Sequence, residues 1–155
     1  MVSFQLIEMV RRHEGVRAHL YRDSLGFWTV GVGHMVDVRK GGWCDDDIAA
    51  RLNKNGFSLS PQVIDAYLRD DLASAERDVQ ELITAKDRLN DARYAALVSM
   101  AFNLGASGFA SFTKARAAIN RGQWREAHDQ LLDSKWARQL PQRAKEIAEI
   151  ILHGG

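Results

Sequence analysis

The chain has 155 residues, 46% of them hydrophobic, and its 21 basic and 20 acidic residues leave a formal net charge of +1. This length fits one domain or two small lobes with a buried core, and the near-zero charge gives no indication of strong nucleic-acid binding. Cys44 is the only cysteine, which excludes an internal disulfide and a cysteine-rich zinc site.

The opening segment, residues 2–14, has the apolar spacing of a helix. Ile7 and Val10 fall on one face, and Glu14 continues that face. Gly15 suits a left-handed cap, so Glu14 would lie at the negative end of the helix dipole. Partial burial and the dipole both disfavour the anion of a carboxyl group there, which suits a general acid. The alternative is an ordinary solvated glutamate at a frayed helix end.

Residues 21–34 have the pattern of a β-hairpin. Asp23 lies among turn-forming residues, flanked by aromatic and β-branched ones, so the bend carries an acid. Strand alternation would place Thr29, Gly31 and Gly33 on one face, where the absence of two side chains lets a flat ligand approach the backbone. The alternative is that the glycines mark bulges and that Asp23 is an ordinary turn residue.

Helices are predicted for most of the remaining chain. The three consecutive acids from Asp45 to Asp47 are expected to cap and start a helix over residues 48–52 rather than to hold a metal ion. Ser60 and Pro61 are a helix start, with the hydroxyl group as N-cap, and open a long helix through Leu82. Further helices are predicted over residues 91–104, 113–121, 124–134 and 141–152.

Several short motifs occur in a fixed order along nearly the whole chain. Those in the first part are Glu14-Gly15, Tyr21-Arg22-Asp23 and Trp28-Thr29-Val30-Gly31-Val32-Gly33-His34. Those further on are Phe102-Asn103-Leu104-Gly105, Gly108-Phe109-Ala110-Ser111-Phe112-Thr113, Gln123-Trp124-Arg125-Glu126-Ala127, Ser134-Lys135-Trp136 and Pro141-Gln142-Arg143-Ala144. This ordered set resembles the phage-type lysozymes, glycoside hydrolase family 24. Only the stretch 36–62 matches loosely.

The resemblance implies a mostly helical α+β fold, a single lysozyme-like catalytic domain over residues 1–155 built from two lobes. We expect a small β-containing lobe over about residues 13–60, a connecting helix over 61–82 and a helical lobe over 83–155. Helix 2–14 is expected to pack on the helical lobe, and the substrate cleft to lie between the lobes.

The resemblance also implies three catalytic residues. Glu14 would be the acid that protonates the departing oxygen. Asp23, in a polar turn, would stay ionised, stabilise the positive charge on the sugar ring and help to activate a water molecule, which Thr29 would position. These roles predict inversion at the anomeric carbon, which needs carboxyl groups about 6.5 to 9.5 Å apart.

Supporting residues follow from the same resemblance. His34 is expected to pair with an acid on the long helix, Asp71 in the first place and Asp70 in the second, in a contact whose strength depends on pH. Arg143 is expected to reach Glu14 and orient it; the alternative is an ordinary surface arginine.

Met35, Phe102 and Gln130 are the expected substrate-binding residues. The family places substrate contacts at the positions of Met35 and Phe102. In the outer subsites, Ala115 and Gln130 stand where a related enzyme has serine and asparagine, so those contacts are expected to differ in detail.

The function implied is that of an endolysin, a muramidase that hydrolyses the β-1,4 bond between N-acetylmuramic acid and N-acetylglucosamine in peptidoglycan and lyses the host at the end of phage infection. No cofactor or metal is expected, the partner is the glycan strand, and a monomer is the expected state. No window approaches the about 18 apolar residues that span a bilayer, and no signal peptide is recognisable. We therefore expect synthesis in the host cytoplasm without a membrane anchor, and action in the periplasm after a holin has permeabilised the membrane.

Two other functions remain open at this point. A lytic transglycosylase needs one catalytic acid and forms an anhydro sugar without activating water; the presence of Asp23 and Thr29 argues against it. A non-catalytic wall-binding or tail-structural module on the same fold would not need Glu14 or Asp23, yet both are present.

Overall fold

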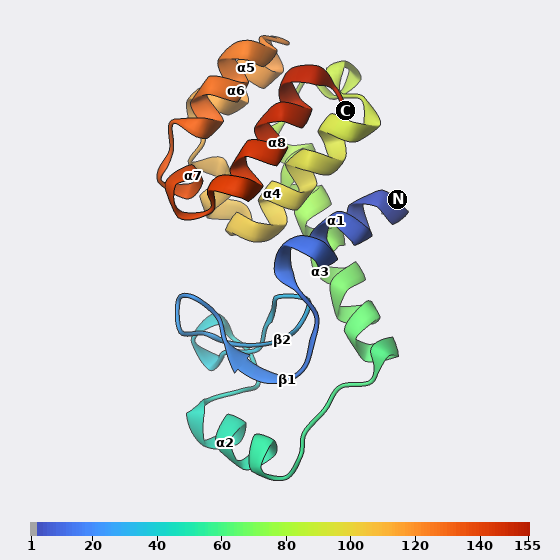
Figure 1. The fold of residues 1–155 in the computed structure, drawn as a ribbon, viewed down its shortest axis with the longest axis vertical. Helices are drawn as coiled ribbons and strands as arrows, with labels where there is room; N and C mark the ends of the chain where they lie inside the picture. Colours follow the sequence, from blue (N-terminus) through green and yellow to red (C-terminus); the bar gives the residue numbers. More distant parts are fainter. Residues whose placement is uncertain (1–2) are drawn as a thin grey trace. The chain divides into compact units, whose positions relative to one another are not determined.

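The computed structural model describes residues 3–155 and divides them into two compact units. One unit is Ile7–Asp71, and the other combines residues 3–6 with Leu72–Gly155. Helices α1 (Phe4–Glu14) and α3 (Pro61–Leu82), which are labelled in Figure 1, each contain residues of both units. The predicted mostly helical α+β fold is confirmed. The predicted lobe boundaries and the packing of helix 2–14 stay predictions, and Val2 lies outside the described residues.

The unit Ile7–Asp71 contains a three-stranded antiparallel sheet in the order β1-β2-β3. The strands are β1 (Arg17–Arg22), β2 (Trp28–Gly31) and β3 (His34–Met35). The turn between β1 and β2 is closed by the Asp23 N–H, which donates to the Phe27 carbonyl at 2.9 Å. The hairpin predicted around Asp23 is therefore confirmed, with the acid at its bend.

The strand alternation predicted to run through Gly33 is wrong. Strand β2 ends at Gly31, and the chain turns through Val32 and Gly33 into β3. Gly31 and Gly33 have φ angles of +66° and +65°, a left-handed conformation that glycine adopts without strain. The glycines therefore make the turn of a second hairpin instead of extending the Thr29 face.

A hydrophobic core of this unit lies between the sheet and α2 (Asp46–Lys54), which follows the 3₁₀ helix η1 (Val38–Lys40) in the chain. Its buried residues are Leu20, Val30, Val36, Cys44 and Ala49, and they are covered by Trp28, Ile48, Leu52, Phe57, Leu59 and Tyr67. Burial raises the pKa of the Cys44 thiol, which keeps it protonated.

The predicted helix starts in this unit are confirmed by their caps. Asp45 Oδ1 accepts the Ile48 N–H at 2.8 Å, and the next two acids lie in the first turn of α2. The helix is longer than the predicted 48–52. Ser60 Oγ accepts the Val63 N–H at 3.3 Å, and Pro61 opens α3, which runs to Leu82 as predicted.

The other unit is helical. It contains η2 (Lys86–Arg88), α4 (Asp91–Ala110), α5 (Thr113–Asn120), α6 (Trp124–Leu132), α7 (Lys135–Gln139) and α8 (Pro141–His153). Helix α8, red in Figure 1, packs against α4, α6 and α7 and buries Ala144, Ile147, Ala148 and Ile151. Within residues 3–155, no single helix has both the length and the apolar composition needed to cross a membrane.

Two predicted helices have different ends. Helix α4 continues past the predicted residue 104 to Ala110, with a break at Gly105, whose φ of 74° and ψ of 170° are not helical. The helix predicted over 124–134 ends at Leu132. Ser134 starts a new helix, α7, because its hydroxyl group caps the Ala137 N–H at 3.1 Å.

Candidate active site

Glu14 is the last residue of α1, and its side chain is half-buried. Gly15 follows with a φ of +74°, and its N–H donates to the Arg11 carbonyl at 2.9 Å, which is the predicted cap. The Glu14 carboxyl group lies against the β2–β3 turn, since a Cβ atom added at Gly33 would lie 3.5 Å from Glu14 Oε2. The helix end and a glycine turn thus hold this acid between them.

Asp23 occupies the β1–β2 turn and is half-buried. Its Oδ1 atom accepts two backbone N–H groups, from Leu25 at 2.9 Å and from Phe27 at 2.8 Å. Its Oδ2 atom takes part in neither bond. The turn therefore fixes the orientation of this carboxylate through one oxygen atom.

Thr29 is 2% exposed and lies in the middle of the sheet. It pairs with Tyr21 of β1 and with Met35 of β3, so these three side chains lie on the same face. Thr29 Oγ1 donates to the Phe27 carbonyl at 2.9 Å. Because its proton is used in this way, the hydroxyl oxygen can accept a hydrogen bond from a water molecule.

Tyr21 also lies in the site, although no role was predicted for it from the sequence. Burial raises its pKa above the ordinary value of 10.0, and the charges of Glu14 and Asp23 add to this rise. Two features lower this pKa. They are the positive charge of Arg17, whose guanidinium group lies 4.4 Å from the ring centroid, and a hydrogen bond that the Gly33 N–H donates to the hydroxyl oxygen. A protonated hydroxyl group thus lies within electrostatic range of both carboxyl groups. The sequence signal that could have identified Tyr21 is its position in the predicted hairpin, where it pairs with Thr29.

His34 makes the contact predicted for it. Its Nδ1 atom lies 2.7 Å from Asp71 Oδ2, and its ring stacks on Tyr67 with centroids 4.1 Å apart and an interplanar angle of 17°. Asp70, the second candidate, is exposed. The contacts join β3 to α3 and hold the strand that carries Met35.

Another carboxylate in this unit, that of Asp37, is almost fully buried at 3% exposure. It binds the Arg39 side chain through both oxygens, with Nε 2.9 Å from Oδ1 and Nη2 2.6 Å from Oδ2. The Trp28 N–H also donates to Oδ2 at 3.3 Å. These hydrogen bonds, of which those from the Arg39 side chain have the largest effect, hold the pKa of Asp37 well below its ordinary value of 3.8.

Replacing Asp37 by asparagine should destabilise the protein at neutral pH and have a diminishing effect in acid. A carboxyl group whose pKa is lowered on folding stabilises the native state above its unfolded pKa, and that contribution is lost as pH falls below the ordinary value of 3.8. Urea unfolding of both proteins from pH 7 to pH 2 measures the difference. A difference that grows in acid would contradict this reading.

The remaining predicted residues belong to the helical unit. Phe102 lies on α4, Arg143 in the first turn of α8 and Gln130 on α6, and all three are half-buried. The contact predicted between Arg143 and Glu14 joins residues of different units and stays a prediction.

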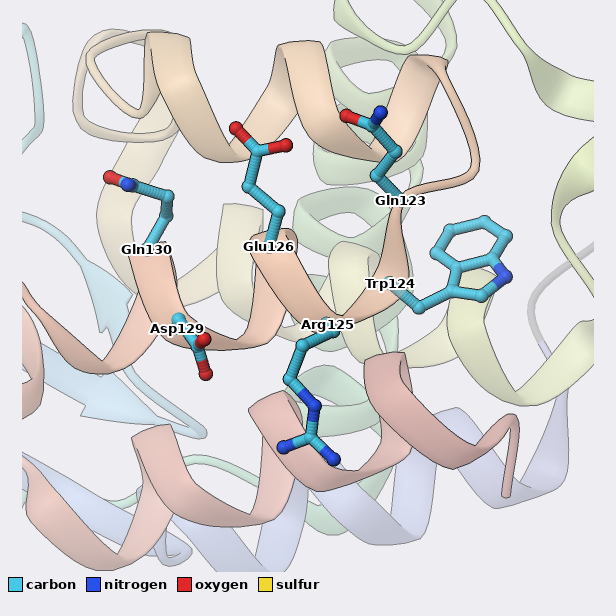
Figure 2. Close-up of a pocket in the computed structure, with 6 residues that line it drawn as sticks. All are labelled: Gln123, Trp124, Arg125, Glu126, Asp129 and Gln130. Carbon is cyan, nitrogen blue, oxygen red and sulfur yellow. The ribbon is translucent and has the colours of Figure 1, made fainter.

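Gln130 lines an open hollow of about 620 Å³ on α6, with Gln123, Trp124, Arg125, Glu126 and Asp129. Figure 2 shows that Gln123, Glu126 and Gln130 extend from one side of the helix, away from Arg125 and Asp129. A polar side chain in such a hollow is compatible with a sugar contact, the role expected of Gln130.

A mostly helical α+β fold with one acid at the end of the first helix and a second in the following hairpin is the arrangement of a lysozyme-type glycoside hydrolase. Residues 11–149 match the model of the family described as phage lysozyme. The chain belongs to the phage lysozyme family, and the resemblance found in its motifs is confirmed.

Individual relatives agree with this assignment. The endolysin of Salmonella phage P22 is 32% identical over 95% of this chain and 95% of its own length. Probable T4-type lysozyme 1 of Dictyostelium discoideum is 25% identical over 99% of this chain and 96% of its own length. The pre-baseplate central spike protein Gp5 of Enterobacteria phage T4 is 30% identical over 98% of this chain, which spans only 28% of that protein.

Proposed function

We propose that this lysozyme hydrolyses the β-1,4 bond between N-acetylmuramic acid and N-acetylglucosamine in peptidoglycan. The main support is the pair of half-buried carboxyl groups within one compact unit, Glu14 at a helix end and Asp23 in a hairpin turn, both within electrostatic range of Tyr21. Glycoside hydrolysis needs two carboxyl groups with different tasks. Membership of the phage lysozyme family supports the same reaction.

In the proposed mechanism, Glu14 gives its proton to the glycosidic oxygen as the bond breaks. Asp23, oriented by two backbone N–H groups, faces the growing positive charge on the sugar ring and helps to activate a water molecule. Thr29 accepts a hydrogen bond from this water, since its own proton is bound to a carbonyl group. Attack by water on the face opposite the leaving group gives inversion at the anomeric carbon.

The proposed substrate contacts and supporting contacts use the other predicted residues. Met35 shares the Thr29 face of the sheet and would contact the glycan there. Phe102 and Gln130 would bind further sugars, and Arg143 would orient Glu14. The His34–Asp71 pair would hold the hairpin in place on α3.

The proposed biological role is that of an endolysin. An endolysin of similar length, 32% identical over 95% of both chains, supports it. The protein would act as a monomer on glycan strands in the periplasm, after synthesis in the host cytoplasm and release by a holin. A tail-associated lysozyme is the second candidate, because the 30% identity to the phage T4 spike protein spans nearly the whole chain. An antibody against this chain would detect it in purified virions only in the second case.

The products of digestion test the proposed reaction. Purified protein is incubated with Gram-negative sacculi, and the released muropeptides are analysed by mass spectrometry and by proton NMR at early times. Hydrolysis with inversion should give reducing N-acetylmuramic acid that appears first as the α-anomer. Anhydro sugars would identify a lytic transglycosylase, and a β-anomer would rule out inversion.

Replacing Gly33 by alanine should lower the cleavage rate at least about tenfold, because the site around Glu14 tolerates little displacement. The new methyl group would contact the Glu14 carboxyl group, and the backbone φ of +65° strains any residue with a side chain. Gly41→Ala is the matched control, since Gly41 has a φ of +74° and nothing within 4 Å of an added Cβ. Both variants should lose about 1 kcal/mol of stability. An equal loss of activity in both variants would mean that backbone strain, and not contact with Glu14, causes the loss.

A further inference from the structure

The turn that carries Asp23 is held from outside by two arginine side chains. Its tip is open to solvent, with Leu25 76% exposed. The carbonyl oxygen of Gly26 accepts one hydrogen bond from Arg22 Nη1 at 2.8 Å and another from Arg39 Nη2 at 3.0 Å. A carbonyl oxygen has two lone pairs, and here both are bound by charged donors.

Arg39 is itself fixed on two sides. Its guanidinium group binds both oxygens of the buried Asp37 and lies 4.4 Å from the centroid of the Phe27 ring. Planar two-point binding to a carboxylate leaves the group little freedom. Arg39 comes from η1, 13 positions after Gly26, so it ties the turn to another part of the unit.

Arg22 is fixed in a similar way. Its Nη2 atom lies 2.7 Å from Asp46 Oδ1, and its guanidinium group lies 4.6 Å from the Trp28 ring centroid. The Trp28 indole N–H donates to the same oxygen of Asp46 at 2.7 Å. We call Arg22, Arg39, Asp37 and Asp46 the Gly26 clamp.

The clamp is connected to Asp23 through two hydrogen bonds, one to its backbone carbonyl and one to its carboxylate. The Gly26 N–H donates to the Asp23 carbonyl at 3.0 Å, and the next residue, Phe27, donates its N–H to Asp23 Oδ1 at 2.8 Å. The peptide group whose oxygen the arginines bind is the one that supplies this Phe27 N–H. Displacement of the Gly26 carbonyl would therefore displace a donor that orients the carboxylate.

We propose that Arg39 is a positioning residue for Asp23: it binds the Gly26 carbonyl and thereby fixes the turn whose amides orient the carboxylate. This inference rests on the role proposed above for Asp23. A catalytic group that moves by about 1 Å can lose about a hundredfold in rate. Because Asp23 is proposed to act on the transition state, we expect the effect on turnover rather than on substrate binding. Arg39 lies in the stretch 36–62, where the family motifs match loosely.

Arg39→Gln tests the proposal, with Arg69→Gln as the control for loss of an equally exposed arginine whose aspartate partner is not buried. The two arginine side chains are 56% and 55% exposed, and each pairs with an aspartate, at 2.6 and 2.7 Å. Arg69 pairs along α3 and does not belong to the clamp. Turnover and KM are measured on soluble peptidoglycan fragments, and the exchange rates of the Leu25 and Phe27 amides are measured by NMR.

We expect Arg39→Gln to lower kcat about tenfold with KM changed less than about twofold, and to accelerate exchange of the Phe27 amide. Arg69→Gln should match the unchanged protein in both measurements. Arg39→Lys keeps the positive charge but lacks the planar guanidinium group, so it should recover part of the lost kcat. All assays are run well below the melting temperature of each variant.

Three results would overturn the proposal: unchanged kcat in Arg39→Gln, a fall in kcat without faster exchange of the turn amides, or an equal fall in Arg69→Gln. If the unchanged protein does not cleave peptidoglycan, the proposed function fails instead. Amide exchange then still decides whether Arg39 holds the turn.

Discussion

Replacing Glu14 by glutamine should reduce peptidoglycan cleavage by at least about a hundredfold, which is the lower end of what a general acid contributes. Glutamine has nearly the same size and can pack against Gly33 as glutamate does, so the turn and the helix cap should persist. It has no proton to give at neutral pH. The loss should therefore appear in activity, measured as clearing of chloroform-treated Gram-negative cells, and not in the melting temperature.

Glu8→Gln is the matched control for this variant. Glu8 lies on the same helix, α1, is exposed, and has no part in the proposed chemistry. The same change in charge there should leave clearing intact. If Glu14→Gln cleared cells as fast as this control, catalysis through Glu14 would have no support.

Replacing Asp23 by asparagine should also lower turnover by about 100-fold or more, the effect expected when a preorganised charge is removed. An asparagine oxygen can still accept the N–H groups of Leu25 and Phe27, so the turn should keep its shape. What is lost is the negative charge that would stabilise the sugar cation and help to activate water. The turnover number on soluble muropeptide oligomers measures this loss.

Asp70→Asn removes a negative charge from an exposed position in the same unit and serves as the control. It should keep full turnover. Retained hydrolysis by Asp23→Asn would refute the role proposed for Asp23. A shift of its products towards anhydro sugars would mean that the Glu14 acid works without water activation, as in a transglycosylase.

Local signals in the sequence were enough to predict the elements that carry both acids. The hairpin around Asp23 follows from turn formers between β-branched and aromatic residues, and the start of α3 follows from Ser60 and Pro61. The cap after Glu14 follows from Gly15. Each of these features is decided by residues within one or two turns of each other, so a single sequence contains the necessary information.

Contacts between distant residues were not accessible in the same way. The family resemblance, and not spacing, preferred Asp71 to Asp70 as the partner of His34, because only the packing of strand against helix selects one of two adjacent acids. No periodic pattern indicated that Arg39 binds Gly26. That contact depends on where η1 brings its side chain after the turn at Gly31 and Gly33, a turn that the strand pattern failed to predict.

The buried Cys44 gives this protein a native probe of local opening. The thiol is 0% exposed, lies in the core of the unit Ile7–Asp71, and is the only sulfhydryl group in the sequence. A colourimetric disulfide reagent can reach it only when that core opens, because burial both shields the sulfur and disfavours the reactive thiolate. The labelling rate therefore reports breathing of the unit that carries Glu14 and Asp23, without any engineered tag.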